Sequence, residues 1–158
     1  MDYYHGYSPE ERNRKLRALH KAFPKRSHPY YSGSCHLCGD PHSAVAPHGE
    51  DYSEPYKWER PAVFALCAPC HGRLHKRFKS PFAWEAYKLH LRRGGYGSDL
   101  KATPSVARQI RKLAHAMSNG KQFPLPLLPD RHLPTGHEWW ELLTSDPASL
   151  TAAWARAR

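Results

Sequence analysis

CHLCGDPHSAVAPHGEDYSEPYKWERPAVFALCAPCHGRLH, residues 35–75, contains all four cysteines of the 158-residue chain and five of its twelve histidines. The cysteines form two Cys-x-x-Cys pairs with 28 residues between the pairs. Two residues between cysteines let one tight turn aim both sulfurs at a single ion, and zinc prefers four such ligands in a tetrahedron. We therefore predict one structural Zn²⁺ bound by Cys35, Cys38, Cys67 and Cys70.

The cellular compartment that the sequence predicts favours metal binding by the cysteines. The first residues, MDYYHGYSPEERNRK, lack the apolar core of a signal peptide, and the chain contains no apolar run of about 18 residues. We expect a cytoplasmic protein with no membrane partner. In a reducing compartment, cysteine pairs of this spacing are metal ligands rather than disulfides.

Histidines form a second group of metal-ligand residue types around the second cysteine pair. His71 and His75 are four positions apart, so a helix that begins near Cys70 would project both imidazoles from one face. Upstream, His48 is followed closely by two carboxylates, and the apolar run AVFAL between them and Cys67 is typical of a strand. Since a four-thiolate site is already closed, the histidines are candidates for a second site that does chemistry.

The segment from about residue 35 to 78 resembles the cysteine-bearing branch of the HNH endonuclease superfamily, and especially small zinc proteins of phages and mobile elements. The resemblance implies an α+β fold with a small ββα-metal, treble-clef-like zinc centre surrounded by helices. It also implies a bacterial, phage or mobile-element origin. The positions that carry it are His48, Asp51, Tyr52, Ser53, Pro55, Leu66, Cys67, Cys70, His71 and His75.

The resemblance also implies roles for individual residues. His71 and His75 would hold a catalytic divalent cation, for which Mg²⁺, Mn²⁺, Ni²⁺ and Zn²⁺ are the candidates. His48 would be either the general base that activates water or a third ligand of that cation. Asp51 or Glu50 would complete the metal shell.

Two positions depart from the family pattern. Counting back from Asp51, Gly49 stands where the family has the second histidine of a doublet. Ala62 stands where the family has the asparagine that orients the base. One of the two hairpin roles, ligand or base, therefore has no side chain.

Charge is distributed unevenly along the chain, which has a net charge of +10 and a pI near 9.6. Residues 71–121 contain 12 lysines and arginines and only two acidic residues, whereas residues 32–70 contain two basic and five acidic residues. The basic half predicts binding of a polyanion, DNA first and RNA as the alternative. The candidate phosphate-binding residues are Arg73, Lys76, Arg77, Lys79, Arg92, Arg93, Arg108, Arg111 and Lys112.

Four pairs in the sequence, each a capping residue followed by proline, are typical of helix starts. They predict helices from Pro9 to about Phe23, from Pro81 to Gly94, from Pro104 to about Ser118, and from Pro147. The expected apolar stripe of the first helix is Leu16, Leu19 and Phe23, and that of the third is Val106, Ile110, Leu113 and Met117.

The length suits one small core, within which we distinguish four segments. They are an N-terminal basic helix and linker (1–34), the zinc-binding core (35–79), a basic helical region (80–120), and a Pro-rich strap with Trp-rich helices (121–158). The strap or the C-terminal tryptophans could alternatively dock on a protein partner.

Three functions remain open on the sequence alone. The first is a metal-dependent DNA endonuclease or nickase. The second is an HNH-like protein that has lost catalysis and binds DNA in a regulatory role. The third is a structural subunit that docks on a protein partner through the strap, or through Trp139 and Trp140.

Overall fold

The computed structural model describes residues 3–125, 128–129 and 131–143. In these residues helices surround one two-stranded sheet, so the fold class is α+β, as the sequence predicts. The α-helices are α1 (Pro9–Ala22), α2 (Ala68–Lys76), α3 (Pro81–Arg92), α4 (Asp99–Ala102) and α5 (Pro104–Ser118). The strands are β1 (Val45–Gly49) and β2 (Val63–Cys67), and short 3-10 helices are η1 (Pro24–Arg26), η2 (Pro29–Tyr31) and η3 (Trp139–Leu142).

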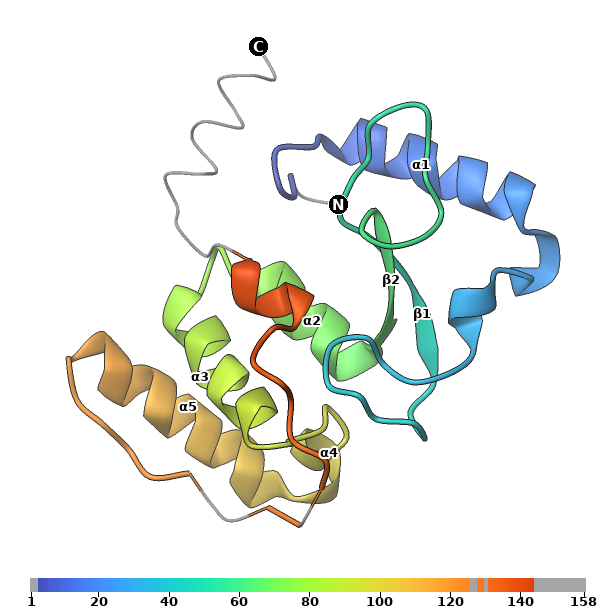
Figure 1. The fold of residues 1–158 in the computed structure, drawn as a ribbon. Helices are drawn as coiled ribbons and strands as arrows, with labels where there is room; N and C mark the ends of the chain where they lie inside the picture. The colour runs from blue at the N-terminus through green and yellow to red at the C-terminus, as the bar shows by residue number, and fades with distance from the viewer. Residues whose placement is uncertain (1–2, 126–127, 130, 144–158) are drawn as a thin grey trace.

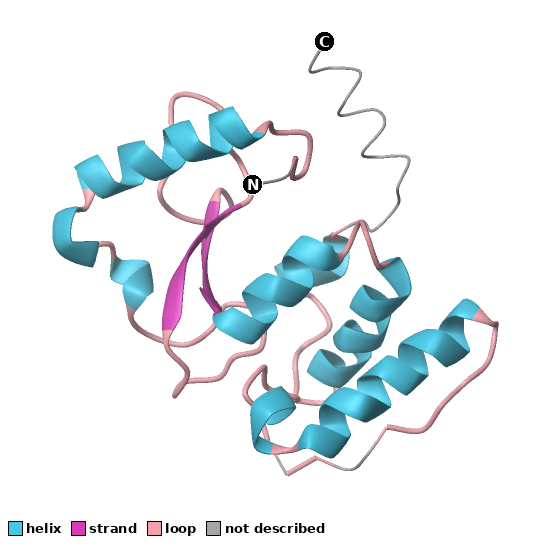
Figure 2. Ribbon diagram, turned by 180° about the vertical axis from the view of Figure 1, so that it is seen from behind, coloured by secondary structure: helices cyan, strands magenta, loops and turns pink. Residues whose placement is uncertain are grey.

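The helix α2 lies between two halves of the molecule. Figure 1 shows α1 and the hairpin on one side of α2, and α3, α4 and α5 on the other. The view from behind shows the same arrangement (Figure 2). Within the described residues, no helix has both the length and the apolar composition needed to cross a lipid bilayer.

The sheet is an antiparallel hairpin that leads directly into α2. The register of β1 and β2 places His48 opposite Phe64. All five residues of β2 are buried, which explains the continuous apolar run in its sequence. Cys67 ends β2 and caps α2, and Pro69 lies in the first helical turn, where the missing N–H costs no hydrogen bond.

Three of the four predicted helix starts are confirmed. α1 begins at Pro9 after a capping box, in which the Ser8 hydroxyl accepts from the Glu11 N–H and the Glu11 carboxylate accepts from the Ser8 N–H. α3 and α5 begin at the expected prolines, and Gly94 and Gly120 follow them at φ of +78° and +66°. Glycine enters this region without the steric cost that other residues incur. The fourth start, at Asp146-Pro147, lies outside the described residues.

The buried face of α1 differs from the predicted stripe. Leu16 is 42% exposed, whereas Lys15 is 4% exposed. The Lys15 ammonium donates to the backbone carbonyl of Asp51 and lies 5.5 Å and 5.6 Å from the ring centroids of Tyr52 and Trp58. Because α1 packs on a loop of backbone carbonyls and aromatic rings, a long cationic side chain fits that surface better than a branched aliphatic one.

The hydrophobic core joins the hairpin, α2, α3, α5 and residues 139–143. Trp140 is fully buried. Trp139 stacks on Phe64 with ring centroids 3.7 Å apart, and its indole N–H donates to the carbonyl of His36 at 2.7 Å. The two tryptophans therefore contribute to the core of the cysteine-containing unit instead of forming a free surface for a partner.

The proline-rich strap is anchored at Arg131. Its guanidinium donates to both carboxylate oxygens of Asp99 at 2.7 Å and 2.9 Å, and it lies 3.9 Å from the Tyr96 ring centroid. Burial by itself raises the pKa of Asp99, but the hydrogen bonds from Arg131 and from the Tyr96 N–H outweigh burial and lower it overall. This ion pair ties the strap to α4.

Asp99→Asn should lower the free energy of unfolding by about 1–3 kcal/mol, because it leaves the half-buried Arg131 guanidinium without its charged partner. Urea unfolding at pH 7 measures the change. A double-mutant cycle with Arg131→Gln should give strongly non-additive losses. Additive losses would mean that this pair does not hold the strap.

Candidate metal centres

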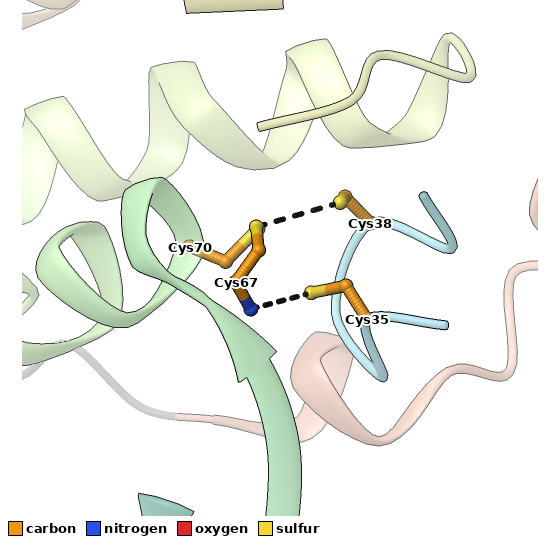
Figure 3. A group of neighbouring side chains, drawn as sticks. All are labelled: Cys35, Cys38, Cys67 and Cys70. Carbon is orange, nitrogen blue, oxygen red and sulfur yellow. Dashed lines mark hydrogen bonds between the residues drawn. The ribbon is translucent and has the colours of Figure 1, made fainter. Parts of the chain in front are cut away.

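The four cysteines converge where three segments meet (Figure 3). Cys35 and Cys38 lie on the loop before β1, Cys67 ends β2, and Cys70 lies in the first turn of α2. All four are free thiols, and their sulfurs lie within 4.8 Å of one another. Sulfurs bound to one zinc ion at about 2.3 Å would be about 3.8 Å apart, so the cluster can close around an ion with only a small contraction.

Hydrogen bonds around the cluster suit thiolate ligands. The Cys67 N–H donates to the Cys35 sulfur at 3.3 Å, and the Tyr87 hydroxyl of α3 lies 3.1 Å from the Cys70 sulfur. Hydrogen bonds from the neighbouring thiols, that of Cys38 first, lower the pKa of Cys35, whereas burial raises the pKa of Cys70. Donors aimed at ligand sulfurs are the usual outer shell of a metal–thiolate site.

Gly97 lets the backbone after α3 pass against the sulfurs. A Cβ at this position would lie 2.9 Å from the Cys67 sulfur and 3.3 Å from the Cys70 sulfur. A residue with a side chain would have to displace one of them. The donor set, the hydrogen bonds and this close approach together fit a metal site with four thiolate ligands.

Three histidines form the second cluster. His48 of β1 and His71 and His75 of α2 each offer one ring nitrogen, and these three atoms lie within 4.8 Å of one another. The Nε2 atoms of His71 and His75 are 2.8 Å apart. The ring centroid of His48 lies 4.8 Å from that of His71 and 5.1 Å from that of His75. The four-residue spacing thus places two imidazoles on one helix face, as predicted, and the hairpin register brings the third to them.

The helix histidines are neutral at pH 7. Desolvation, together with the nearby His48 ring, lowers the pKa of His71 to about 4 and that of His75 to about 3. A neutral imidazole has a lone pair to offer a cation. His71 is exposed and His48 is buried, so the cluster faces solvent on the α2 side.

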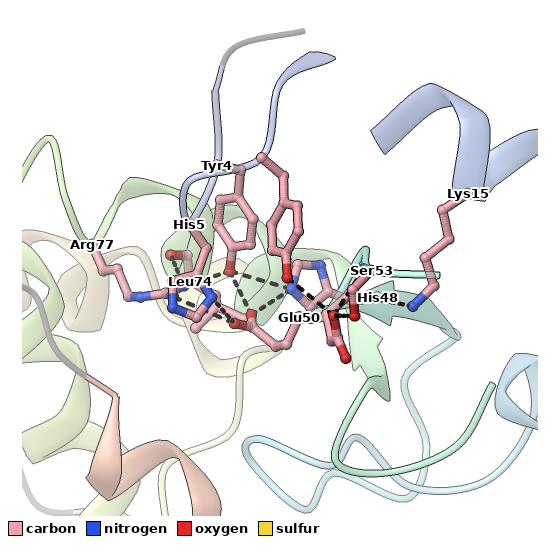
Figure 4. A network of polar contacts seen from close by, with 10 residues as sticks. Tyr4, His5, Lys15, His48, Glu50, Ser53, Leu74 and Arg77 are labelled. Atoms are coloured by element: carbon pink, nitrogen blue, oxygen red, sulfur yellow. Dashed lines mark hydrogen bonds and ion pairs between the residues drawn. The ribbon is translucent and has the colours of Figure 1, made fainter. Parts of the chain in front are cut away.

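A buried network of hydrogen bonds holds the ring of His48 (Figure 4). The Glu50 carboxylate accepts from His48 Nε2 at 2.7 Å and from the Tyr4 hydroxyl at 2.5 Å, and Arg77 donates to both Tyr4 and Glu50. Burial raises the pKa of Glu50, but His48, Arg77 and Tyr4 outweigh it and lower the pKa to about 2. Glu50 is therefore a carboxylate that orients the His48 ring, as outer-shell carboxylates orient metal-bound histidines.

Asp51 belongs to a different set of contacts. Its carboxylate accepts from the Ser53 N–H at 2.9 Å, from the Ser53 hydroxyl at 2.6 Å and from the Tyr7 hydroxyl at 3.0 Å. Among the described residues, the histidine cluster includes no carboxylate. The placement of Asp51 does not match the predicted role in a metal shell, because its oxygens organise the loop after β1.

The two positions that depart from the family pattern are filled in other ways. A Cβ at Gly49 would lie 3.2 Å from Tyr52 Cζ, so the phenol occupies the space next to this glycine. Ala62 is buried, and its carbonyl accepts from the backbone N–H groups of Glu50 and Asp51. Backbone hydrogen bonds hold the hairpin where the family pattern has an asparagine side chain.

The predicted phosphate contacts on and after α2 differ in exposure. Lys76 and Lys79 are exposed, and Arg73 is half-buried, 5.7 Å from the Tyr87 ring centroid. Arg77 is 1% exposed, and it donates to the Tyr4 hydroxyl and the Leu74 carbonyl. Its burial is incompatible with the predicted contact to a phosphate, since its charge is used inside the protein.

The remaining predicted phosphate contacts lie on α3 and α5. Arg92 donates to both carboxylate oxygens of Glu141 at 2.7 Å and 2.6 Å, which holds η3 on α3, and Arg93 is half-buried at the helix end. The predicted residues of α5 are exposed and line a groove of about 580 Å³. Among the described residues, no carboxylate belongs to the lining of this groove. The cations of this groove are Arg108, Arg111, Lys112 and Lys121.

Sequence reasoning misses four residues that contact the two clusters or border them. They are Tyr4, Arg12, Lys15 and Tyr87. The Tyr4 ring centroid lies 4.4 Å from that of His75, although 71 positions separate them in the chain. The aromatic segment YYHGY at the N-terminus is a signal that could point to Tyr4, whereas no spacing motif includes the other three.

Comparisons of the chain with family models, with curated proteins and with solved structures gave no match.

Gly97→Ala should weaken metal binding at the cysteine cluster by about 10- to 100-fold, because the added methyl group would overlap the Cys67 sulfur. Competition with a zinc chelator measures this affinity. Gly72→Ala is the matched control: it adds a methyl group on α2 with no atom within 4 Å, and it should retain the metal. Equal affinities of the two variants would contradict a tight fit at Gly97.

Proposed function

We propose that this chain is a zinc-containing, HNH-like protein that binds DNA and hydrolyses its phosphodiester bonds with the help of a second divalent cation. The observation that carries the proposal is the histidine cluster, in which three ring nitrogens lie within 4.8 Å of one another. They come from the hairpin and the helix that also hold the cysteine cluster. Zinc at the four cysteines has a structural role, since four thiolates leave no position for substrate.

The histidine cluster has the properties of a catalytic site. Three ligands leave coordination positions open, and the exposure of His71 makes those positions reachable from solvent. Bound there, a divalent cation would polarise the phosphate and stabilise the leaving oxygen. Glu50 fixes the ring of His48 through the bond to Nε2.

We assign His48 as a ligand of the cation rather than as the general base. A general base must reach the water from which it takes a proton. His48 is 3% exposed, and its Nε2 is already held by Glu50, so only the other ring nitrogen is available. This assignment agrees with Gly49 standing where the family pattern has the second histidine of the doublet.

The charge distribution supports DNA as the polyanion. Lys76 and Lys79 are exposed on and just after the helix that carries His71 and His75. A second basic surface, the groove on α5, has basic side chains over more than one helical turn and, in the part of the chain that the structure describes, no carboxylate in its lining. Two separate basic surfaces suit a long polyanion better than a small anionic metabolite.

A specific observation favours a second candidate, an HNH-like protein that binds DNA without cleaving it. Gly49 and Ala62 offer no polar side chain at the two places where the family has them. Such a protein would retain both metal clusters for stability and both basic surfaces for binding. The docking-subunit alternative has less support, because Trp139 and Trp140 are packed in the core.

A plasmid-nicking assay distinguishes the two. The wild type should nick supercoiled DNA with Mg²⁺, Mn²⁺ or Ni²⁺, and His71→Ala/His75→Ala should lower the rate by at least about 100-fold, because it removes two of three cation ligands. Zinc is counted on both proteins, and the double variant should keep the zinc of the cysteine cluster.

The control for this assay is His20→Ala, which removes an exposed histidine of α1 that is outside the cluster. It should nick at the wild-type rate. No nicking by the wild type with any of the three metals, combined with intact DNA binding, would replace the endonuclease proposal by the non-cleaving one.

Arg108→Ala/Arg111→Ala/Lys112→Ala should weaken DNA binding at low salt and reduce the slope of log K against log salt by about one for each phosphate that the variant no longer neutralises. Fluorescence anisotropy over a salt series measures both quantities. The matched control, Arg108→Lys/Arg111→Lys/Lys112→Arg, keeps the charge and should keep the slope. An unchanged slope in the alanine variant would exclude the α5 groove from the DNA-binding surface.

A further inference from the structure

A cavity of about 180 Å³ lies beside the histidine cluster, between α1 and the hairpin. One of its walls is formed by His48, His71 and His75. The remaining walls are mainly apolar and aromatic, and their main side chains are Leu16, Leu19, Tyr52, Trp58 and Val63. The cavity is therefore larger than the cation site needs and differs from it in chemistry.

Two cations from α1 also line the cavity. The Arg12 guanidinium lies 5.2 Å from the Tyr4 ring centroid and 5.8 Å from that of Tyr52, and the Lys15 ammonium lies 5.5 Å from Tyr52. Aromatic faces attract such cations. Among the described residues, no carboxylate side chain lines the cavity, so the charged side chains of its lining are basic and suit an anion.

The mouth of the cavity presents apolar surface to solvent. Leu16 is 42% exposed there, although it lies in the middle of α1 and next to the buried Lys15. A ligand that matches these walls has a flat ring whose apolar faces lie against Leu16 and Trp58, and a negative group within reach of the cations and histidines that line the cavity. A nucleotide has both parts in one molecule.

We infer that this cavity holds the unpaired base of the nucleotide at the scissile phosphate, so that the substrate is single-stranded or locally melted nucleic acid. The inference rests on the proposed function for the role of that phosphate. In a paired duplex the base is stacked between its neighbours and cannot enter a cavity, whereas an unpaired base rotates out at little cost. Stacking on aromatic side chains then binds the base with little sequence preference.

Two measurements test the inference without requiring cleavage. NMR titration of the zinc-loaded protein, with no other divalent cation, uses thymidine 5′-monophosphate, thymidine and inorganic phosphate as probes. The monophosphate should shift signals of Trp58 and Leu16, and inorganic phosphate should not reproduce those shifts. Fluorescence anisotropy then compares a short single-stranded oligonucleotide with the same sequence as a duplex, and the single strand should bind more tightly.

The variant Leu16→Trp fills the mouth of the cavity without changing charge. It should weaken single-strand binding by about tenfold or more and leave duplex binding unchanged. Leu142→Trp is the matched control at a leucine that is 88% exposed and outside the cavity, and it should bind like the wild type. If Leu16→Trp does not fold, Leu16→Ala should show a smaller loss in the same direction.

The outcomes distinguish failure of the cavity assignment from failure of the proposed hydrolysis. Tighter duplex binding, or equal single-strand affinity of Leu16→Trp and Leu142→Trp, would overturn the inference even if the protein nicks DNA. Shifts caused equally by inorganic phosphate alone would also overturn it, because no base would then be recognised. Absence of nicking together with nucleotide shifts at Trp58 would leave the cavity assignment intact and refute the hydrolysis.

Discussion

The cysteine cluster is the contact on which the rest of the structure depends. It joins a loop before β1 to the junction of β2 and α2, segments that 28 residues separate in the chain. A metal ion bound by the four cysteines would stabilise a core this small, because the binding energy of a structural metal is also folding energy. The hairpin and α2, which contain Cys67 and Cys70, also carry His48, His71 and His75, whose ring nitrogens lie within 4.8 Å of one another.

Buried charge around the histidines is balanced within one network. Glu50 and Arg77 are nearly inaccessible to water, and each would be costly if it were alone. Together with Tyr4 and His48 they satisfy one another, and the Tyr4 hydroxyl lies between the two charges. The N-terminal segment is therefore part of the site. Because Glu50 is occupied in this way, its carboxylate orients the His48 ring.

Local sequence signals predict much of the fold and part of the site. The Ser-Pro and Thr-Pro pairs at Ser8, Ser80 and Thr103 predict the starts of α1, α3 and α5, since a helix start depends on residues that are neighbours in the chain, although only Ser8 makes a side-chain capping hydrogen bond. The spacing of His71 and His75 predicts a shared helix face for the same reason. Leu16 and Arg77 are two of the failures, beside Asp51. Their burial depends on what lies opposite them, and helical periodicity carries no information about an opposing loop or a buried carboxylate.

The sequence by itself determined the candidate metal ligands, the helix starts and the concentration of positive charge after residue 70, because each follows from residue type and short-range spacing. Only the tertiary structure decided which residues serve the site from a distance. In the folded protein Tyr4 contacts His75, and Lys15 and Arg77 are buried. Gly97 lies against the sulfurs, and the cavity forms between α1 and the hairpin. These contacts join residues that are far apart in the chain, and such pairs are selected by packing and charge balance in the folded protein, which no local pattern records.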